Sequence, residues 1–501
     1  MANEKRVDLT AKVINLCQRR GIIFPSCEIY AVHAGFFDYG PLGVQFKRNI
    51  ENAWWNRFVV SREDVVGIEG ALLSPRTLWK ASGHLDSFTD PLVECKKCGL
   101  RSRADHLVED ALKINVDGLS VKHLQQMIDK HKLACPKCKG TLLPIRTFNL
   151  MFKTHVGATA DEADEAFLRP ETAQLIFADY KLTQFVSRKQ FPFGIAQVGK
   201  AFRNEIAPRN FVFRCREFTQ MEIEYFIRPN KLDDCLLLGA DLLDQEMVFF
   251  TAACQENKTD ALRMTLRDAL AKRVVATRWH AYWLAECFNW IVSLGINPAR
   301  LRLRQHTRDE LSHYSSETWD VEYEYPWGWK ELMGIANRTD FDLKQHAKAS
   351  GKDLAFHDQA TNEKIVPYII EPSLGADRLL FTLLMDAYRE TGEGTDVKTV
   401  LSLSPQIAPV FVSIFPLMKK DGLAEKAREI FNQLRKDGFV ADYDEGGSIG
   451  RRYARSDEAG TPFAITVDYD SLKDNTVTLR ERDSGKQRRI PSNELAAVLR
   501  A

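Results

Sequence analysis

The spacing of apolar residues predicts an antiparallel sheet in the middle of the chain. In FGIAQVGKAFRNE (193–205) and FVFRCREFTQMEIEYF (211–226), apolar and polar residues alternate with the period of two that is typical of strands. GPLGVQFKRNIENAWWNRFV (40–59) has apolar residues near helical spacing behind Pro41, which predicts an amphipathic helix. DVEYEYPWGWKELMGIANR predicts a further strand pair, and VPYIIEPSLGADRLLFTLLMDAYRE predicts a strand that runs into a helix.

Changes in these patterns predict an α+β protein with several parts. After the loop LSLSPQIAP, strands and helices alternate, as in α/β domains. Upstream, a stretch bracketed by cysteines interrupts the core, and a later stretch rich in leucine and alanine has a helical pattern. The expected parts are an antiparallel sheet flanked by helices (1–90, 148–230 and 296–400), a small insert (91–147), a helical insert (231–295) and a C-terminal α/β domain (405–501).

Composition narrows the class of protein. Of the 501 residues, 45% are hydrophobic and 27% are charged, which is enough apolar material for large cores and argues against disorder. No run approaches the ~18 apolar residues of a membrane span, and MANEKRVDLTAKV does not resemble a secretion signal. We therefore expect a cytoplasmic enzyme without a membrane partner. Because the net charge is +1, nucleic-acid binding would depend on local basic patches.

Four of the ten cysteines form two CxxC pairs. Cys95 and Cys98 lie in ECKKCG, and Cys135 and Cys138 lie in ACPKCKG. Four thiolates in two such turns can close a tetrahedral Zn²⁺ site, so we expect structural zinc. Disulfides are the main alternative, disfavoured in a cytosolic protein, and free thiols are the second.

The segment FRNEIAPRNFVFRCREFTQMEIEYF (202–226) concentrates opposed charges. If it forms strands, Phe218, Gln220, Glu222 and Glu224 share one face. Fixed arginines suit phosphate oxygens, an aromatic ring can stack on a purine, and carboxylates can hold an amine. A solvated sheet face with cross-strand ion pairs would produce the same pattern, and the residues alone leave both readings open.

Several motifs follow one another in the order of a known enzyme family. The helix and strand at 41–75, FRNE with REFTQME, and EPSLGADR resemble motifs 1, 2 and 3 of the class II aminoacyl-tRNA synthetases. With WKASGHLDSFTDP, RADHL, FNLMFKT, LRPETAQLIF and GWKELMGIANRTDFDL, they make nearly the whole chain similar to the dimeric type of glycyl-tRNA synthetase.

This resemblance implies a fold and an activity. The core would be the class II sheet, the 91–147 insert a zinc-type module and the C-terminal domain an anticodon-binding domain. The activity would be that of a homodimeric glycine–tRNA ligase, which activates glycine with ATP and Mg²⁺ to glycyl-adenylate and transfers it to the 3′ end of tRNA(Gly). The alternative is a catalytically inactive synthetase-like protein that binds RNA or regulates another enzyme.

The resemblance also implies roles for individual residues. Arg203 would grip the ATP α-phosphate and the glycine carboxylate, Phe218 would stack on adenine, and Arg203, Arg378 and Glu331 would be catalytic. The expected ATP-binding residues are Arg203, Asn204, Glu205, Phe213, Arg214, Cys215, Arg216, Glu217, Phe218, Glu331, Leu332, Gly375, Ala376, Asp377 and Arg378. The expected glycine-binding residues are Arg103, Glu171, Phe218, Gln220, Glu222, Glu371, Ser373 and Gly375.

The C-terminal domain offers candidate contacts to a tRNA loop. In SIGRRYARSDEAG, Arg451, Arg452 and Arg455 surround Tyr453 on one predicted helix. Basic groups for phosphates beside an aromatic ring for an unstacked base suit single-stranded RNA. A solvated helix face is the alternative.

Overall fold

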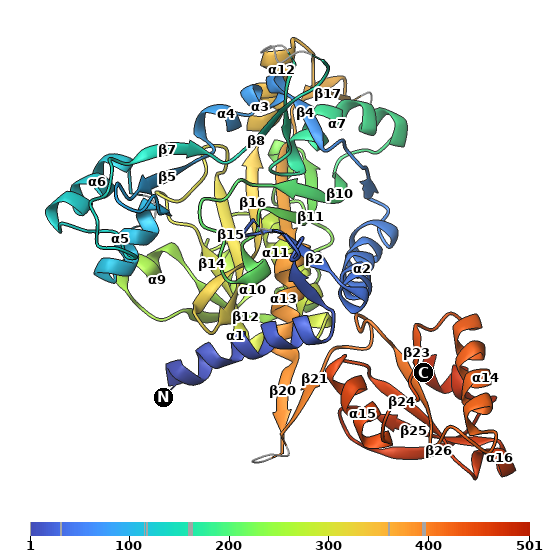
Figure 1. The fold of residues 1–501 in the computed structure, drawn as a ribbon. Helices are drawn as coiled ribbons and strands as arrows, with labels where there is room; N and C mark the ends of the chain where they lie inside the picture. Colours follow the sequence, from blue (N-terminus) through green and yellow to red (C-terminus); the bar gives the residue numbers. More distant parts are fainter. Residues whose placement is uncertain are drawn as a thin grey trace.

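The centre of the molecule is a nine-stranded, mostly antiparallel sheet (Figure 1). The computed structural model describes residues 2–30, 33–114, 116, 119–158, 164–358, 361–392 and 397–500. In spatial order, the strands of this sheet are β13 (Leu262–Thr265), β12 (Glu246–Phe250), β14 (Leu301–Gln305), β15 (Glu317–Tyr325), β16 (Gly328–Thr339), β19 (Tyr368–Gly375), β11 (Glu217–Ile227), β10 (Phe193–Phe202) and β3 (Val65–Gly67). The predicted α+β class with an antiparallel sheet is confirmed.

Helices cover both faces of this sheet. They are α1 (Ala2–Arg19), α2 (Pro41–Trp55), α11 (Arg278–Ser293) and α13 (Ala376–Ala387) on one face, and α7 (Ala173–Ser187) and α12 (Phe341–Ser350) on the other. As predicted, α2 begins at Pro41, and one π-helical turn (Asn56–Val60) extends it. Gly43 allows the close approach of Ile22, which follows α1, because a Cβ at position 43 would lie 1.8 Å from the Ile22 carbonyl oxygen.

The β10–β11 hairpin separates polar from apolar side chains as its alternation predicts. Met221, Ile223 and Tyr225 belong to the main core, where the Tyr225 ring lies 5.0 Å from that of Trp283 on α11. The opposite, polar face is not solvated: Glu222 and Glu224 are 1% and 0% exposed. The interpretation of this segment as a solvated ion-pair face is therefore wrong for these two carboxylates.

The segment 231–295 is mixed, so the prediction of a helical insert is wrong for part of it. It contains α8 (Ala240–Leu243), α9 (Ala252–Asn257), α10 (Leu266–Ala271) and α11, but also β12 and β13, which extend the central sheet. In β12, Met247 and Phe249 are buried and alternate with more exposed neighbours. The strand is held between β13 on one side and β14, some 50 residues further along the chain, on the other.

The shorter elements of the core support its edges and connections. They are β1 (Ile23–Pro25), β2 (Phe37–Tyr39), β4 (Leu73–Pro75), β8 (Phe152–His155), β9 (Glu165–Leu168), β17 (Phe356–Asp358), β18 (Glu363–Ile365), α3 (Arg76–Ala81), α4 (His84–Ser87) and the 3₁₀ turns Phe211–Phe213, Pro229–Lys231 and Pro298–Arg300.

Two further modules have cores of their own. The cysteine-bearing module comprises β5 (Thr89–Glu94), β6 (Arg101–Arg103), β7 (Arg146–Asn149), α5 (Ala104–Leu112) and α6 (Val121–Lys130). The C-terminal domain has the sheet order β23-β22-β24-β25-β26. Its elements are β22 (Val412–Pro416), α14 (Leu423–Lys436), β23 (Ala441–Tyr443), α15 (Ile449–Glu458), β24 (Phe463–Val467), α16 (Ser471–Asp474), β25 (Thr476–Glu481), β26 (Gln487–Pro491) and α17 (Leu495–Arg500). The predicted α/β domain is confirmed.

The beginning of the chain contacts the C-terminal domain. At the end of α1, Arg19 donates to Glu458 of α15 at 2.9 Å, and Arg20 donates to the same carboxylate at 2.5 Å. The hairpin of β20 (Tyr388–Thr391) and β21 (Lys398–Leu401) precedes this domain, and both lie below the sheet in Figure 1. In the described part of the chain, no helix has both the length and the apolar character needed to cross a membrane.

Candidate active site

A pocket lies where the β10–β11 hairpin meets the end of β19 and the start of α13. The predicted ATP-binding residues that line it are Arg203, Glu205, Phe213, Arg214, Cys215, Phe218, Glu331, Gly375, Asp377 and Arg378. Gln220 and Ser373, which were predicted for glycine, line it as well. The fold thus brings together residues from positions 203 to 378.

Arg203 lies between the two groups of predicted residues. Its guanidinium carbon is 5.4 Å from the ring centroids of both Phe88 and Phe218. Its Nε donates to the carbonyl of Pro170, the neighbour of Glu171, at 3.0 Å. Within the described residues, its two Nη groups have no hydrogen-bond partner, so a guanidinium held between two rings is available for anions.

A chain of ion pairs connects the pocket wall with Arg103. Arg214 Nε donates to Glu205 at 2.7 Å, and its Nη2 lies 3.7 Å from Asp90. Asp90 also accepts from Arg103 Nη1 at 2.6 Å. Arg103 itself does not line the pocket; it lies behind it and contacts its wall through Asp90.

Arg378 and Glu331 form the other side of the pocket. Arg378 Nη1 lies 3.1 Å from Glu331 Oε1, and its guanidinium is centred 4.7 Å from the Phe213 ring. The charge of Arg378 lowers the pKa of Glu331. The Glu331 side chain is 51% exposed, so it presents an ionised carboxylate at the edge of the pocket.

Two residues predicted to bind ATP, Asp377 and Arg216, form hydrogen bonds within the protein. Both oxygens of the buried Asp377 are used: Oδ1 accepts from Tyr39 and from Lys47, the latter at 2.9 Å, and Oδ2 accepts from the Thr219 backbone N–H at 2.5 Å. Arg216 donates to the carbonyls of Glu205 and Ala34, each at 2.7 Å. These contacts position Arg378 and the loop that carries Arg214.

Four further predicted ATP residues lie outside the lining of the pocket. Leu332 and Ala376 are buried in the main core. Glu217 pairs with Lys200 at 2.9 Å. Asn204 is held through its backbone N–H, which donates to Leu150 O at 2.7 Å.

Three residues predicted to bind glycine, Gln220, Glu222 and Ser373, form a hydrogen-bonded row on β11 and β19. Gln220 Nε2 donates to Ser373 Oγ at 2.7 Å and to Glu222 Oε1 at 2.8 Å. The other oxygen of Glu222 accepts from the Thr172 hydroxyl. Burial and the nearby charge of Glu171 raise the pKa of Glu222, so the site favours the arrival of a cation.

Glu171 and Glu371 are held by partners that the sequence had not indicated. Glu171 lies 3.3 Å from His84 Nε2 and accepts from Gln174 at 3.0 Å. Burial alone would raise the pKa of Glu171, but His84, Arg338 and Gln174 hold it well below its usual range. Arg338 donates to Glu371 at 2.8 Å.

Arg338 is a buried cation between the sheet and α12. It donates to both oxygens of Asp342, at 2.8 and 3.0 Å, and its guanidinium is centred 3.9 Å from the Tyr314 ring. Its side chain is only 2% exposed. Arg338 lies at the end of β16 and Asp342 at the start of α12, so no helical spacing in the sequence indicated this pair.

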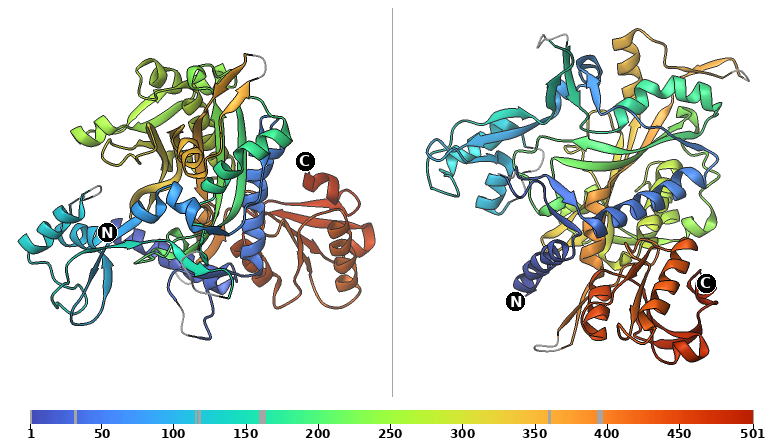
Figure 2. Two further views of the ribbon diagram at one scale, coloured as in Figure 1. Left: turned by 90° about the horizontal axis from the view of Figure 1, so that it is seen from above. Right: turned by 45° about the vertical axis from the view of Figure 1, so that its right-hand side comes forward.

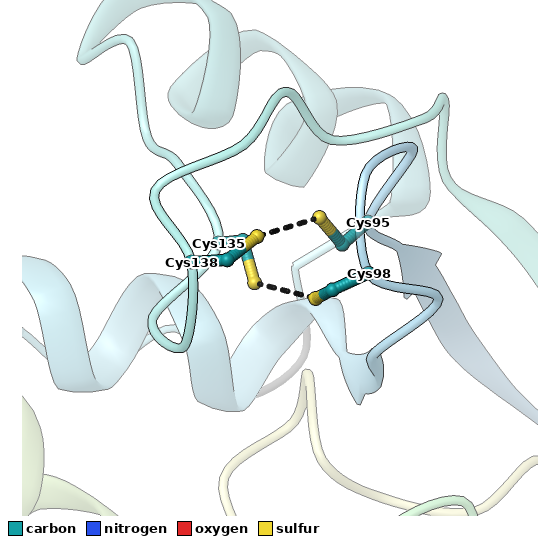
Figure 3. Close-up of side chains that lie close together, drawn as sticks. All are labelled: Cys95, Cys98, Cys135 and Cys138. Carbon is teal, nitrogen blue, oxygen red and sulfur yellow. Dashed lines mark hydrogen bonds between the residues drawn. The ribbon is translucent and has the colours of Figure 1, made fainter.

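The four predicted zinc ligands converge in the cysteine-bearing module (Figure 3). Their sulfur atoms lie within 4.8 Å of one another, with Cys95 and Cys138 at 3.5 Å and Cys98 and Cys135 at 3.6 Å. A disulfide needs about 2.05 Å, whereas Zn–S bonds of about 2.3 Å in a tetrahedron separate the sulfurs by about 3.8 Å. The geometry fits a metal ion and not a disulfide.

The basic helix of the C-terminal domain is only partly exposed. Arg452 is buried and donates to the carbonyls of Pro416 and Gly447, so it is not available for the contact with a tRNA loop that the sequence predicts. Arg455 is paired with Asp444 at 2.5 Å. Arg451 is exposed.

A solved structure shares this fold. Prolyl-tRNA synthetase from Giardia lamblia, in complex with prolyl-adenylate, superposes with a TM-score of 0.60 over 99% of this chain and 75% of its own, at 16% identity. The nine-stranded sheet and the C-terminal domain have the fold of a class II aminoacyl-tRNA synthetase.

Sequence comparisons identify the family within this class. Residues 411–501 match the family model described as "Anticodon binding domain". The glycine–tRNA ligase of Clostridium beijerinckii is 46% identical over 100% of this chain and 99% of its own, and that of Clostridium tetani is 47% identical over the same shares. The enzyme of Caldanaerobacter subterraneus is 46% identical over 97% of both chains. The chain belongs to the glycine–tRNA ligase family.

Proposed function

We propose that this protein activates glycine with ATP and transfers it to the 3′ end of tRNA(Gly). The observation that carries this proposal is the family membership over the full chain, combined with a pocket that presents Arg203, Arg214, Phe218 and Arg378. Glycine would bind on the row of Gln220, Glu222 and Ser373, next to ATP. An inactive synthetase-like protein is not favoured, because the relatives are ligases and these groups are retained.

The chemistry requires positioning and charge stabilisation more than covalent help. The glycine carboxylate attacks the α-phosphorus, pyrophosphate leaves, and the tRNA 3′-terminal hydroxyl then attacks the adenylate. Two anions must approach each other in the first step, and Arg203 would lie between them with its Nη groups free. Since glycine has no smaller competitor, a sterically closed pocket provides selectivity without an editing site.

Amino-acid-dependent exchange of pyrophosphate into ATP tests this function. Exchange with glycine alone is expected. Exchange with alanine or serine would contradict the glycine pocket, and no exchange with any amino acid would favour the inactive alternative. Charging of tRNA(Gly) by the same preparation tests the second step.

Mg²⁺ would accompany ATP. Glu331 is the suitable ligand among the pocket residues, because its carboxylate is ionised and half exposed. The ion would neutralise charge on the phosphates of the bound nucleotide.

For the tRNA, the exposed Arg451 offers a phosphate contact beside the paired Arg455. A cytoplasmic location stays a prediction.

We also propose a homodimer whose interface includes α7. Leu182, Phe185 and Val186 of this helix are 63%, 76% and 65% exposed at helical spacing, an apolar surface typical of interfaces. The motif 1 helix α2, for which the resemblance predicts the contact, lies on the same side of the molecule, which comes forward in the right-hand view of Figure 2.

Charge introduced on α7 should dissociate this dimer. We expect a mass of about twice 57.2 kDa in sedimentation equilibrium, falling to 57.2 kDa in a Leu182→Asp/Phe185→Asp variant, because two carboxylates would be buried without partners. Leu236→Asp, at an exposed leucine of another segment, is the control. A wild-type monomer, or a double variant that stays dimeric, would contradict the proposal.

The cysteine module would hold one structural Zn²⁺. We expect metal analysis to find about one zinc per chain and Cys98→Ser to lower it to near zero, with faster proteolysis of residues 89–149, because the ion joins two loops that lie far apart in sequence. Cys27→Ser, which changes an exposed cysteine outside the module, should leave both readouts unchanged. Wild-type protein that contains no zinc would contradict this proposal.

A further inference from the structure

One side chain next to the glycine-binding row has no part in the contacts described above. Glu224 of β11 is 0% exposed, and within the described residues neither of its carboxylate oxygens has a hydrogen-bond partner. A buried ionised carboxylate without a partner costs several kcal/mol, so something must compensate its charge.

The neighbours of Glu224 are mostly acidic. The antiparallel register of β11 and β19 places it beside Glu371, and one oxygen each of Glu222, Glu224 and Glu371 lie within 4.8 Å of one another. Glu171 and Asp342 add further negative charge near this group, while Arg338 is the nearby cation. Because Arg338 already pairs with both Asp342 and Glu371, the group retains excess negative charge.

Two kinds of positive charge can compensate this excess. Burial, reinforced by the charge of Glu371, raises the pKa of Glu224 well above its usual range, which favours a bound proton. An ammonium ion arriving at Glu222 and Glu371 would supply a competing positive charge. When a positive charge enters a buried pocket of low polarity, it repels the positive charges already there. A bound proton therefore tends to leave the pocket.

We propose that Glu224 holds a proton when the glycine site is empty and releases it when the ammonium group of glycine binds. The O–H bond of Glu224 breaks, the proton passes to solvent, and the carboxylate then contributes to holding the ammonium through Glu222 and Glu371. Glu224 is thus a positioning residue whose charge depends on occupancy. This inference rests on the proposed function.

This exchange makes glycine binding depend on pH in a defined direction. Because binding releases a proton, a higher pH favours it, and the KM for glycine should fall as the pH rises above the usual range of a glutamate side chain, by at most tenfold per pH unit. The KM for ATP should not follow this trend. In Glu224→Gln the side chain keeps its shape but cannot ionise, so the KM for glycine should be nearly independent of pH.

Pyrophosphate exchange with wild type, Glu224→Gln and the exposed control Glu246→Gln measures these profiles. We expect the wild-type and Glu224→Gln values to converge at low pH, and the wild type to bind glycine about tenfold more tightly at high pH. Glu246→Gln should match the wild type. Equal slopes in wild type and Glu224→Gln would overturn the proposal while leaving the glycine-dependent exchange, and hence the proposed function, intact.

Calorimetry of the wild type gives a test that needs no variant. Titration with glycine in buffers of different ionisation enthalpy should show the release of up to one proton. No release would overturn the proposal. A thermal stabilisation by Mg²⁺ alone, present in wild type and lost in Glu224→Gln, would also overturn it, because a metal ion would then be the compensating charge.

Discussion

Replacing Arg203 with alanine is expected to reduce glycine-dependent pyrophosphate exchange about a thousandfold. The guanidinium is the group placed between the ATP-side and glycine-side residues, and loss of one preorganised donor to a developing anion typically costs about 3–4 kcal/mol. The fold should persist, because the side chain makes one backbone hydrogen bond, to Pro170, and two ring contacts. Exchange rates and thermal unfolding of the same preparation measure both effects.

Arg209→Ala provides the matched control for this variant. Arg209 is an exposed arginine of the loop between β10 and β11 and lies outside the lining of the pocket. Its loss should change exchange less than about threefold, since it removes charge from the same loop without removing a donor from the pocket. Exchange near the wild-type rate in Arg203→Ala would contradict the role assigned to Arg203.

Arg338→Met is expected to destabilise the catalytic core by about 3–5 kcal/mol. The substitution leaves Asp342 and Glu371 buried without the cation that pairs with both, and a broken buried ion pair typically costs that amount. Urea unfolding measures the loss, and glycine KM should rise because Glu371 loses its fixed orientation. An effect on stability below about 1 kcal/mol would contradict this account.

A surface pair gives the comparison for Arg338. Arg101→Met removes an exposed arginine that donates to Glu94 at 3.1 Å. Solvent and salt screen such a pair, so its loss should cost about 0–1 kcal/mol. The contrast separates the effect of burial from the loss of an arginine as such.

The sequence was sufficient for the sheet and for most of the pocket. The period of two in 193–226 determines which side chains of β11 face the core, because a shift of one residue would expose Met221 and Tyr225. The sequence pattern could not predict β12, because this short strand lies between β13 and the distant β14 and depends on the assembled sheet. The resemblance placed Arg216 among the ATP-binding residues, but its contact with the carbonyl of Ala34 could not be predicted, since this contact is defined only by the folded loop.

The buried charges were harder to anticipate. An alternating strand predicts that Glu222 and Glu224 share a face but does not predict whether water reaches it. Burial follows from α7 packing over the hairpin, a tertiary contact with no local signature. The partners His84, Thr172 and Arg338 lie in motifs that the resemblance had marked, but their contacts depend on that packing.

The ion pairs between α1 and Glu458 have a consequence for biosynthesis. Arg20 leaves the ribosome 438 residues before its partner. At a synthesis rate of roughly 5–20 residues per second, about 20–90 s pass between the synthesis of α1 and that of its partner in the C-terminal domain. The catalytic core must therefore take shape while this helix still lacks its last contact, and the joining of the two ends is a late event in the maturation of each new chain.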